Sequence, residues 1–428
     1  MTALLPIGLS VAGLLFAWLC FTDLPLAVAV FAAILPSYLF RFSLPLPGFT
    51  VPTTFLEICF GLLTLGWLYS GRARQAAPLL KRWAAPLLLL LVSAAIATAI
   101  APDLRAALGI LRAYILEPVL FFFVASTTLT DETARRRVIY ALGAAVAALS
   151  ALAIYQKITG NGIPPVWQPA DVRRVTSVFE YPNALGLFVA PVLPLLAGLT
   201  AFLAFDGRKK RRWLALLPAA AAPLGLIAII FAVSKGAALG AVAGLLLVGL
   251  LDRRLRAATL ITIIVACVTI ISVPSIRGWF AVRADLRDAS GSVRQIVWGE
   301  SWAMLRDHPV FGAGLSGYPL VLPPYHEAEY IEIFQYPHDI VLNFWTELGL
   351  TGLAAFGWIV AASLRRPIRR LRRAHPEAWL DAALLGAFAA ILVHGLVDVP
   401  YFKNDLAMAF WLLAALAAAP RPKDGTAN

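Results

Sequence analysis

Long apolar runs alternate with short polar connections along the whole chain. Each run has roughly 17 to 23 residues, enough for a helix to cross the hydrocarbon core of a bilayer. The runs do not alternate apolar and polar positions, as transmembrane strands would. The pattern therefore predicts an all-α polytopic membrane protein. The expected spans are 4–21, 24–40, 53–70, 84–100, 109–127, 138–156, 184–204, 213–233, 237–251, 257–273, 339–362, 379–397 and 404–419.

The number of spans depends on the first 40 residues. Only Thr22 and Asp23 separate the first two runs, which form either two tightly connected spans or one span and a helix lying in the interface. We therefore expect about 12 transmembrane helices, or 13. The N-terminal run has no charged region before it, which favours a first membrane helix over a cleaved signal peptide. A proline-rich connector is expected at 45–52.

Charge sets the expected orientation. Only 14% of the residues are charged, against about a quarter in soluble proteins. The net charge of +12 is concentrated in short connections, which the positive-inside rule places in the cytoplasm. Each basic run adjoins a span, so nucleic-acid binding is disfavoured. The basic connections are 72–82, 135–137, 208–212, 253–256 and 365–373.

The alternate connections then face outside, and one of them is unusually long. Segment 274–338 has about 65 residues, and loops of this length are usually functional. It divides the chain into N-terminal membrane helices (1–273), a long, partly helical periplasmic loop (274–338), and C-terminal membrane helices with a short tail (339–428). Within the loop, 292–306 predicts a helix with Trp298, Trp302 and Leu305 on one stripe, which rests on the membrane interface or packs against the bundle.

Cationic side chains recur in the outward connections. Arg174 (beside Arg173), Lys235 and Arg294 each lie close to a span. A cation there is costly unless it is paired or serves a ligand, and arginine suits phosphate through its bidentate fork. We expect the set to form a phosphate site. The alternative is pairing with lipid headgroups or with local acids, namely Glu180, Asp285, Asp288 and Glu300.

Histidines provide candidate proton acceptors. His338 begins the span that follows the long loop, and its imidazole suits a general base, although an interfacial hydrogen-bonding role fits too. His394 and Asp398 lie one turn apart near an outer end and support the site or form a structural hydrogen bond. His308 precedes Pro309 and is expected to end a helix. The three cysteines and the sparse acids show no metal-ligand spacing, so we expect no metal and no cofactor.

Several motifs, in order, resemble the bacterial O-antigen ligase and O-antigen polymerase superfamily. The resemblance covers roughly the C-terminal 60% of the chain, and the order of the motifs is more specific than any one of them. The similar pieces are R-V-T-S-V-F-E-Y-P-N-A-L-G (174–186), V-S-K-G-A (233–237), S-V-R-Q-I-V-W (292–298), D-H-P-V-F-G-A-G (307–314), P-H-D-I-V-L-N-F-W-T-E-L-G-L-T-G-L (337–353) and H-G-L-V-D-V-P (394–400).

The resemblance implies a GT-C-like membrane glycosyltransferase of the cell envelope. Such enzymes work without a metal in the bacterial inner membrane. They move a glycan from undecaprenyl pyrophosphate, at the periplasmic face, to lipid A–core, to a growing glycan or to a protein hydroxyl. By resemblance, Arg294 holds the pyrophosphate and His338 activates the acceptor, while Arg174 matches a frequent basic position. Lys235 falls where many members have arginine, so it keeps the charge and loses the fork.

Other functions remain open on sequence. A polymerase or a protein O-oligosaccharyltransferase differs from a lipopolysaccharide ligase only in its acceptor. A polysaccharide or lipid transporter would show related halves and polar residues near the bilayer midplane, whereas the polar groups here crowd to the outer edge. A non-catalytic scaffold would not need Arg294 and His338 to meet. We expect acceptor choice to lie within 308–337.

Overall fold

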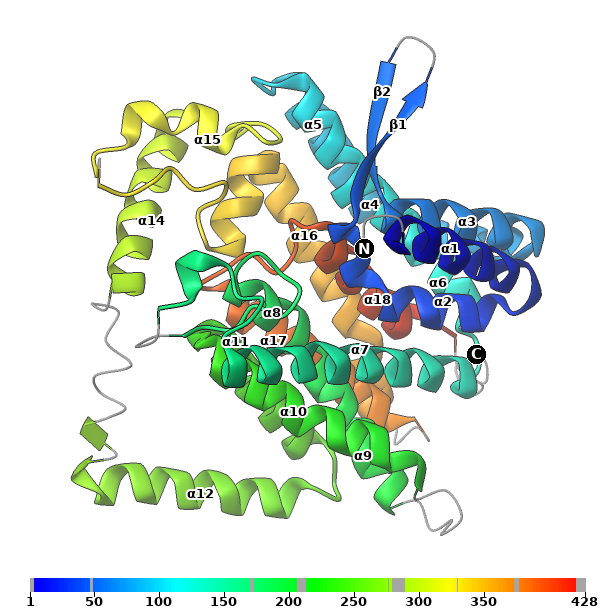
Figure 1. Ribbon diagram of the computed structural model, residues 1–428, viewed down its shortest axis with the longest axis vertical. Helices are drawn as coiled ribbons and strands as arrows, with labels where there is room; N and C mark the ends of the chain where they lie inside the picture. The colour runs from blue at the N-terminus through cyan, green and yellow to red at the C-terminus, as the bar shows by residue number, and fades with distance from the viewer. Residues whose placement is uncertain are drawn as a thin grey trace.

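A computed structural model describes residues 4–46, 49–169, 173–205, 213–275, 277–278, 289–328, 330–372 and 377–420. These residues form a bundle of helices with a single small β-hairpin (Figure 1). In the first part of the chain the elements are α1 (Leu4–Thr22), α2 (Leu24–Ala33), β1 (Arg41–Leu46), β2 (Phe49–Thr54), α3 (Phe55–Tyr69), α4 (Ala76–Ala99), α5 (Leu104–Ile110), α6 (Glu117–Thr128) and α7 (Glu132–Thr159).

The second part of the chain supplies the remaining helices. A π-helical turn, Leu111–Leu116, joins α5 to α6, and short 3₁₀ turns lie at Leu35–Leu39, Arg72–Gln75, Pro165–Trp167 and Pro323–Tyr325. The further helices are α8 (Pro182–Val189), α9 (Val192–Phe205), α10 (Leu216–Ala232), α11 (Lys235–Leu251), α12 (Arg256–Ser272), α14 (Ala289–Asp307), α15 (Tyr318–Val321), α16 (Ile340–Arg372), α17 (Ala378–Gly395) and α18 (Asn404–Ala418).

The helices confirm the all-α polytopic class. Seven helical segments among the described residues are long and apolar enough to cross a membrane, and six shorter apolar helices accompany them. Each corresponds to one predicted run. The second predicted run, 24–40, is a ten-residue helix, α2, followed by a 3₁₀ turn. Because Ala27, Val28 and Phe31 are fully buried, α2 packs inside the bundle and does not lie on its surface.

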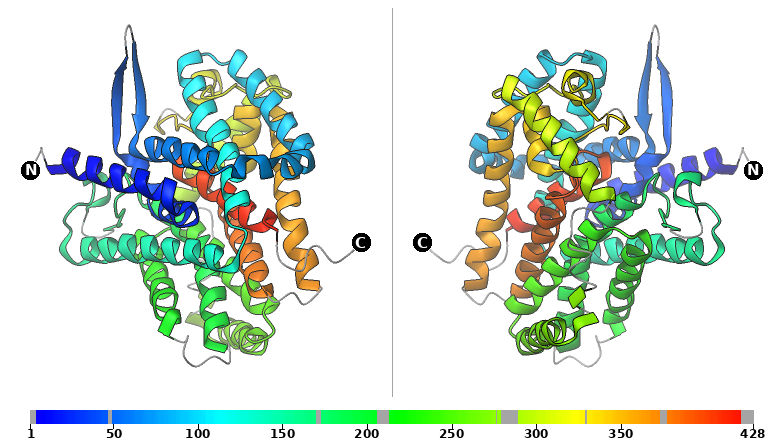
Figure 2. Two further views of the ribbon diagram at one scale, coloured as in Figure 1. Left: turned by 90° about the vertical axis from the view of Figure 1, so that its right-hand side faces the viewer. Right: turned by 90° about the vertical axis from the view of Figure 1, so that its left-hand side faces the viewer.

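The proline-rich connector forms a β-hairpin, which the sequence did not predict. Strands β1 and β2 pair antiparallel, with Arg41 opposite Thr54 and Leu46 opposite Phe49. Pro45 and Pro52 fit because a two-stranded hairpin has only edge strands, where a missing N–H is tolerated. The hairpin projects beyond the helices in all three views (Figures 1 and 2).

Several basic side chains meet at one end of the bundle. Arg72 donates to the carbonyl of Thr127, Arg137 pairs with Asp23, and Arg370 donates to the carbonyls of Ala417 and Ala419. The turns after α1, α3, α6 and α16 therefore lie on a common face, which we call the basic face. The connections 208–212 and residue 373 lie outside the described residues. The loops 160–169, 308–339 and 396–403 lie at the opposite helix ends, on what we call the site face.

Glycines let α11 approach α17 closely. A Cβ at Gly240 would lie 2.6 Å from the carbonyl oxygen of Ala390, and one at Gly244 would lie 2.6 Å from that of Gly386. Small residues one turn apart are a common way to pack membrane helices. The contact fixes the end of α17 that leads into the loop 396–403. Helix α12, by contrast, has no buried side chain among those described.

A loop of the site face is inserted into a break in α16. Gly349 has φ +71° and ψ −178°, so the regular hydrogen bond from the Leu350 amide to the Thr346 carbonyl is open. The amide of Leu350 instead donates to Val310, 2.9 Å away, and the carbonyl of Thr346 accepts from Ala313 at 2.7 Å. The loop therefore satisfies both groups that the break exposes. Segment 312–317 thus approaches the backbone of a neighbouring helix closely, since a Cβ at Gly312 would lie 2.3 Å from the carbonyl oxygen of Trp345.

Candidate active site

Helix α14 confirms the predicted helix in the long loop and presents Arg294. Its side chain is half-buried and donates from Nε to the carbonyl of Val397, 2.8 Å away. Nη1 donates to the carbonyl and hydroxyl of Ser290 one turn earlier. No acceptor for Nη2 is found among the described residues. Arg294 therefore bridges the start of α14 to the loop 396–403 while keeping one terminal nitrogen available.

Arg174 reaches the same region from the loop before α8. Its Nε donates to the carbonyl of Ala232 (2.9 Å), and Nη2 donates to Asn183 Oδ1 (3.2 Å) and to the carbonyl of Val233 (3.4 Å). The guanidinium lies over the ring of Trp167, 5.0 Å from its centroid. Burial, and then the positive charge of Arg294, lower the pKa of Arg174. The two arginines are therefore electrostatic neighbours.

Neither arginine makes an ion pair with an acid of the part of the chain that the structure describes. Glu300, one of the acids considered as partners, instead accepts from His326 Nδ1 at 3.1 Å and from two backbone amides. Glu180 is exposed. Asp285 and Asp288 lie outside the described residues. The positive charge of the pair is thus held by neutral carbonyl and amide oxygens, an arrangement that leaves it available to an anion.

His338 and Asp398 form a third part of the site. Nδ1 of His338 lies 3.5 Å from Oδ1 of Asp398, and the Asp398 side chain is 1% exposed. Oδ1 also accepts from the amide of Val399 (2.9 Å), and Oδ2 accepts from Asn183 Nδ2 (2.9 Å). Burial alone would raise the pKa of Asp398, but the contacts with His338, His394 and the Val399 amide lower it to about 2. The carboxylate therefore stays ionised beside His338.

Aromatic side chains surround His338. Its ring meets Phe334 and Tyr336 edge-on, with centroids 5.0 and 4.9 Å away. The hydroxyl of Tyr336 is 3.0 Å from that of Tyr181, and the Lys403 ammonium lies 4.4 Å from the Tyr181 ring centroid. Burial raises the pKa of both phenols, so both remain protonated. His338 thus projects from an aromatic wall.

The remaining predicted residues lie around this centre. Lys235 is the exposed first residue of α11, two positions after Val233, whose carbonyl accepts from Arg174. His394 is 2% exposed and packs against Gly236, where a Cβ would lie 2.7 Å from its Cδ2 atom. The structure therefore brings Arg174, Arg294, His338 and Asp398 together through side-chain contacts. Lys235 and His394 adjoin them through the S-K-G turn.

Backbone strain occurs at the candidate site and in the segments that carry its residues. Among the described residues, four that are not glycine have positive φ, between 52° and 59°. Val233 is β-branched, for which this conformation is unfavourable, and His338 is one of the four. Such strain persists where the surrounding structure fixes it and gathers at functional sites. The four residues are Ser177, Val233, Ser316 and His338.

The family comparison matches the region that carries these residues. Residues 220–357 match the family model described as O-antigen ligase. Over this segment the chain is similar to that family. The matched segment is about a third of the chain, shorter than the predicted resemblance, and it includes Lys235, Arg294 and His338. No curated protein matches the chain.

The match confirms the resemblance to the O-antigen ligase and polymerase superfamily and supports a function of that type in a multi-pass membrane protein. Arg174, Asn183 and Asp398 lie outside the matched segment and join the site only through contacts. Asn183 was missed as a site residue. The signal available for it was its place at the end of Y-P-N, directly before a span.

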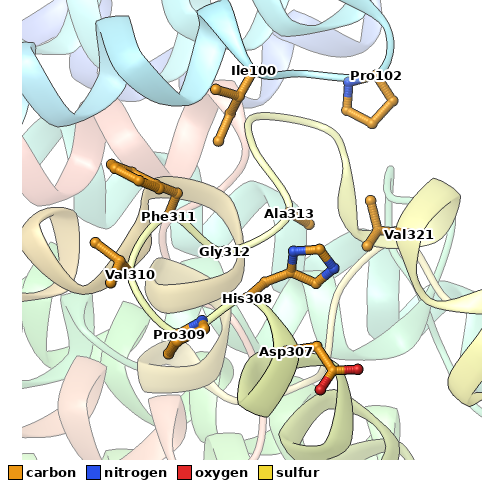
Figure 3. Close-up of a pocket in the computed structure, with 10 residues that line it drawn as sticks. All are labelled: Ile100, Pro102, Asp307, His308, Pro309, Val310, Phe311, Gly312, Ala313 and Val321. Carbon is orange, nitrogen blue, oxygen red and sulfur yellow. The ribbon is translucent and has the colours of Figure 1, made fainter.

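A separate cavity of about 410 Å³ is lined by residues of segment 307–321 together with Ile100 and Pro102 (Figure 3). It lies at the far end of α14 from Arg294, because Asp307 is 13 residues later and thus ~20 Å along the helix. The walls are mainly apolar, with the His308 ring beside Ala313 and Val321. His308 follows the last residue of α14, as predicted. No group of three or more potential metal ligands gathers among the described residues.

Proposed function

We propose that the protein transfers a glycan from undecaprenyl pyrophosphate to an acceptor hydroxyl, as an O-antigen ligase does, at the periplasmic face of the inner membrane. The observation that carries the proposal is a pair of neighbouring arginines, without acidic partners among the described residues, beside a His338–Asp398 pair. The transfer requires a binding site for the anionic pyrophosphate and an acceptor for the proton of the hydroxyl. The family match to residues 220–357 supports the same class of reaction.

Arg174 and Arg294 would hold the pyrophosphate. As the bond between the anomeric carbon and the pyrophosphate oxygen breaks, the electron pair leaves with that oxygen. Negative charge then grows next to donors that are already in position, which is an effective form of transition-state stabilisation. Lys235, at the start of α11, would add a point charge. Membrane lipids would surround the helices, and the lipid-linked donor would reach the site by diffusion within the membrane.

His338 would take the proton of the acceptor hydroxyl. Asp398 faces Nδ1, which leaves Nε2 for the acceptor oxygen. The acceptor oxygen forms the new bond to the anomeric carbon as its proton passes to Nε2, and direct displacement inverts the configuration. Asp398 stabilises the imidazolium that results, as carboxylates do in other acid–base pairs. His394 supports the loop that carries Asp398. No metal enters these steps, which remains a prediction.

The test is a transfer assay with purified protein, an undecaprenyl-pyrophosphate-linked oligosaccharide and lipid A–core. We expect His338→Ala and Arg294→Ala each to lower transfer by at least ~100-fold while the protein remains monodisperse in detergent. Arg306→Ala, at an exposed arginine in the last turn of α14, is the matched control, with transfer near that of wild type. Near-wild-type transfer by either site variant would contradict the assignment.

The acceptor distinguishes the ligase from its closest alternatives. Product that grows only on a second lipid-linked glycan would identify a polymerase, and product on a peptide hydroxyl a protein O-oligosaccharyltransferase. Movement of the intact donor across a proteoliposome membrane, with no bond made, would identify a transporter. The same preparation serves all four measurements.

A further inference from the structure

Asn183 joins the arginine that would bind pyrophosphate to the carboxylate that faces the base. Its Oδ1 accepts from Arg174 Nη2 at 3.2 Å, and its Nδ2 donates to Asp398 Oδ2 at 2.9 Å. The side chain is half-buried in the first turn of α8. Nothing in the transfer chemistry proposed above uses Asn183.

The chemistry of the two partners fixes the orientation of the amide. A guanidinium has only donors, so it must meet the amide oxygen, and an ionised carboxylate has only acceptors, so it must meet the amide nitrogen. Aspartate at this position would offer only acceptors to both partners, and leucine would offer neither a donor nor an acceptor. Glutamine is longer by one methylene. Asparagine is therefore the short side chain that satisfies both neighbours at once.

Asp398 is held on both of its oxygens. Oδ2 meets Asn183, while Oδ1 meets the Val399 amide and faces His338. Removal of the amide donor would free one oxygen and allow the carboxylate to turn about its final bond. The preceding residue, Val397, accepts from Arg294. Arg294 is thus bonded directly to the segment that orients His338, and Arg174 is bonded to it through Asn183.

We propose that Asn183 is a positioning residue that couples occupation of the arginine pair to the orientation of His338. Through Asn183, Arg174 holds the Asp398 carboxylate in the plane that faces Nδ1 of His338. An anion that engages Arg174 and Arg294 thereby acts on the base through Asn183 and through the Val397 carbonyl. This inference rests on the transfer reaction proposed above.

The first experiment is Asn183→Leu, which has nearly the same shape and no hydrogen-bonding groups. We expect kcat to fall roughly 10- to 100-fold, the range for a lost hydrogen bond to a charged group, while the KM for the lipid-linked donor changes by less than about threefold. Asn161→Leu, at an exposed asparagine in the loop after α7, is the control and should leave both constants unchanged. An effect confined to donor KM would assign Asn183 to the anion site alone and overturn the coupling.

The second experiment is Asn183→Asp, which keeps the acceptor toward Arg174 and loses the donor toward Asp398. Position 183 faces Arg174 and Asp398, with Arg294, His338 and Tyr181 next to them. Two carboxylates in contact share a proton, so the pKa of the pair's second ionisation is raised. Once protonated, the new carboxyl can donate to Asp398 as the amide did. The ratio of variant to wild-type kcat should therefore rise as pH falls from 8.5 to 5.5.

A flat ratio across this range, or a kcat for Asn183→Leu equal to that of wild type, would overturn the inference. Either result leaves the proposed function intact as long as wild-type protein transfers glycan. Loss of the proposed function would appear differently, as no transfer by the wild type or full transfer by Arg294→Ala. Melting temperatures of the two Asn183 variants show whether folding is affected, and the pH ratio is read within one variant.

Discussion

Buried or half-buried arginines lie at both ends of the bundle, but their partners differ in kind. On the basic face, Arg135 is fully buried and uses all three nitrogens: Nε and Nη2 meet the carboxylate of Glu377 at 3.0 and 2.5 Å, and Nη1 meets the carbonyl of Leu129. On the site face, Arg174 and Arg294 meet carbonyl, hydroxyl and amide oxygens, and each has one terminal nitrogen without an acceptor among the described residues.

This difference in hydrogen-bond partners distinguishes an arginine that stabilises the fold from arginines that are available to bind a ligand. A buried arginine matched by a bidentate carboxylate is neutralised within the chain, and removal of either partner leaves an unpaired charge. An arginine held only by dipoles is fixed in place but keeps its charge. Its natural partner is an anion from outside the chain. The hydrogen-bond acceptors around each arginine, and not its burial, therefore distinguish the two faces, and they support the proposal that pyrophosphate binds on the site face.

The largest effect should come from a change on the site face. We expect Arg294→Gln to lower transfer roughly 100- to 1,000-fold, because a donor to the leaving pyrophosphate is lost where charge develops. Undecaprenyl pyrophosphate should raise the melting temperature of wild-type protein and fail to raise that of the variant at the same concentration. Arg306→Gln, on the exposed last turn of α14, should keep both responses. An unchanged ligand-induced shift in Arg294→Gln would remove the distinction between the two faces.

The reciprocal change on the basic face should act on stability. Arg135→Met removes the buried guanidinium that pairs with the Glu377 carboxylate, which should cost about 3–5 kcal/mol of folding free energy. Transfer per folded molecule should not change. The double variant Arg135→Met/Glu377→Leu should recover most of the loss, since both charges are then gone. Thermal unfolding in detergent measures the stability, and a single variant as stable as wild type would show that the pair contributes little.

A smaller effect is expected at the break in α16. Gly349→Ala would place a Cβ 2.4 Å from the Val310 carbonyl oxygen at a positive φ, so the inserted loop must move. We expect a loss of about 1–3 kcal/mol and reduced transfer. Gly357→Ala is the matched control in the same helix, because nothing lies within 4 Å of its Cβ, and it should be neutral or slightly stabilising. Equal melting temperatures for the two variants would contradict the inserted-loop geometry.

The smallest effect concerns pH. The pKa of Asp398 is lowered to about 2, below the ordinary value near 3.9. Its contribution to folding is therefore fully present above about pH 4 and is lost only as pH falls toward 2. The difference in melting temperature between wild type and Asp398→Asn should thus not shrink as pH falls from 8 to 5. A difference that shrinks within this window would show that Asp398 takes up a proton there.

The membrane helices were predictable because apolar length alone determines them. Every predicted run appears as a helix, and α14 was predicted from its aromatic stripe. Of that stripe, Leu305 is buried and Trp302 meets Trp345 of α16 edge-on, so this face packs against the bundle. The hairpin was missed because Pro45 and Pro52 suggest a connector, and only cross-strand pairing shows that an edge strand accepts them.

Arg294 and His338 could be predicted as site residues from the sequence, but Asn183 could not. Arg294 and His338 are unusual residues at the borders of spans, so the cost of placing them there is visible in the sequence. Asn183 carries no such cost, since an amide before a helix has an ordinary capping or turn role. Its two contacts join residues 174 and 398, which only the fold brings near. The pairing of Arg135 with Glu377 is likewise a contact across 242 positions.

The inserted loop also limits how the site can move. Because the amides of Ala313 and Leu350 are protected by each other's segments, the loop and the upper turns of α16 should exchange their hydrogens with solvent as one cooperative unit. Opening the loop alone would leave the Leu350 amide and the Thr346 carbonyl without hydrogen bonds, which is costly in a poorly hydrated setting. This part of the site face is therefore assembled before any substrate binds. Under the proposed function, the acceptor would bind next to a loop that is already ordered, and any conformational change on binding would occur in the glycan and its lipid.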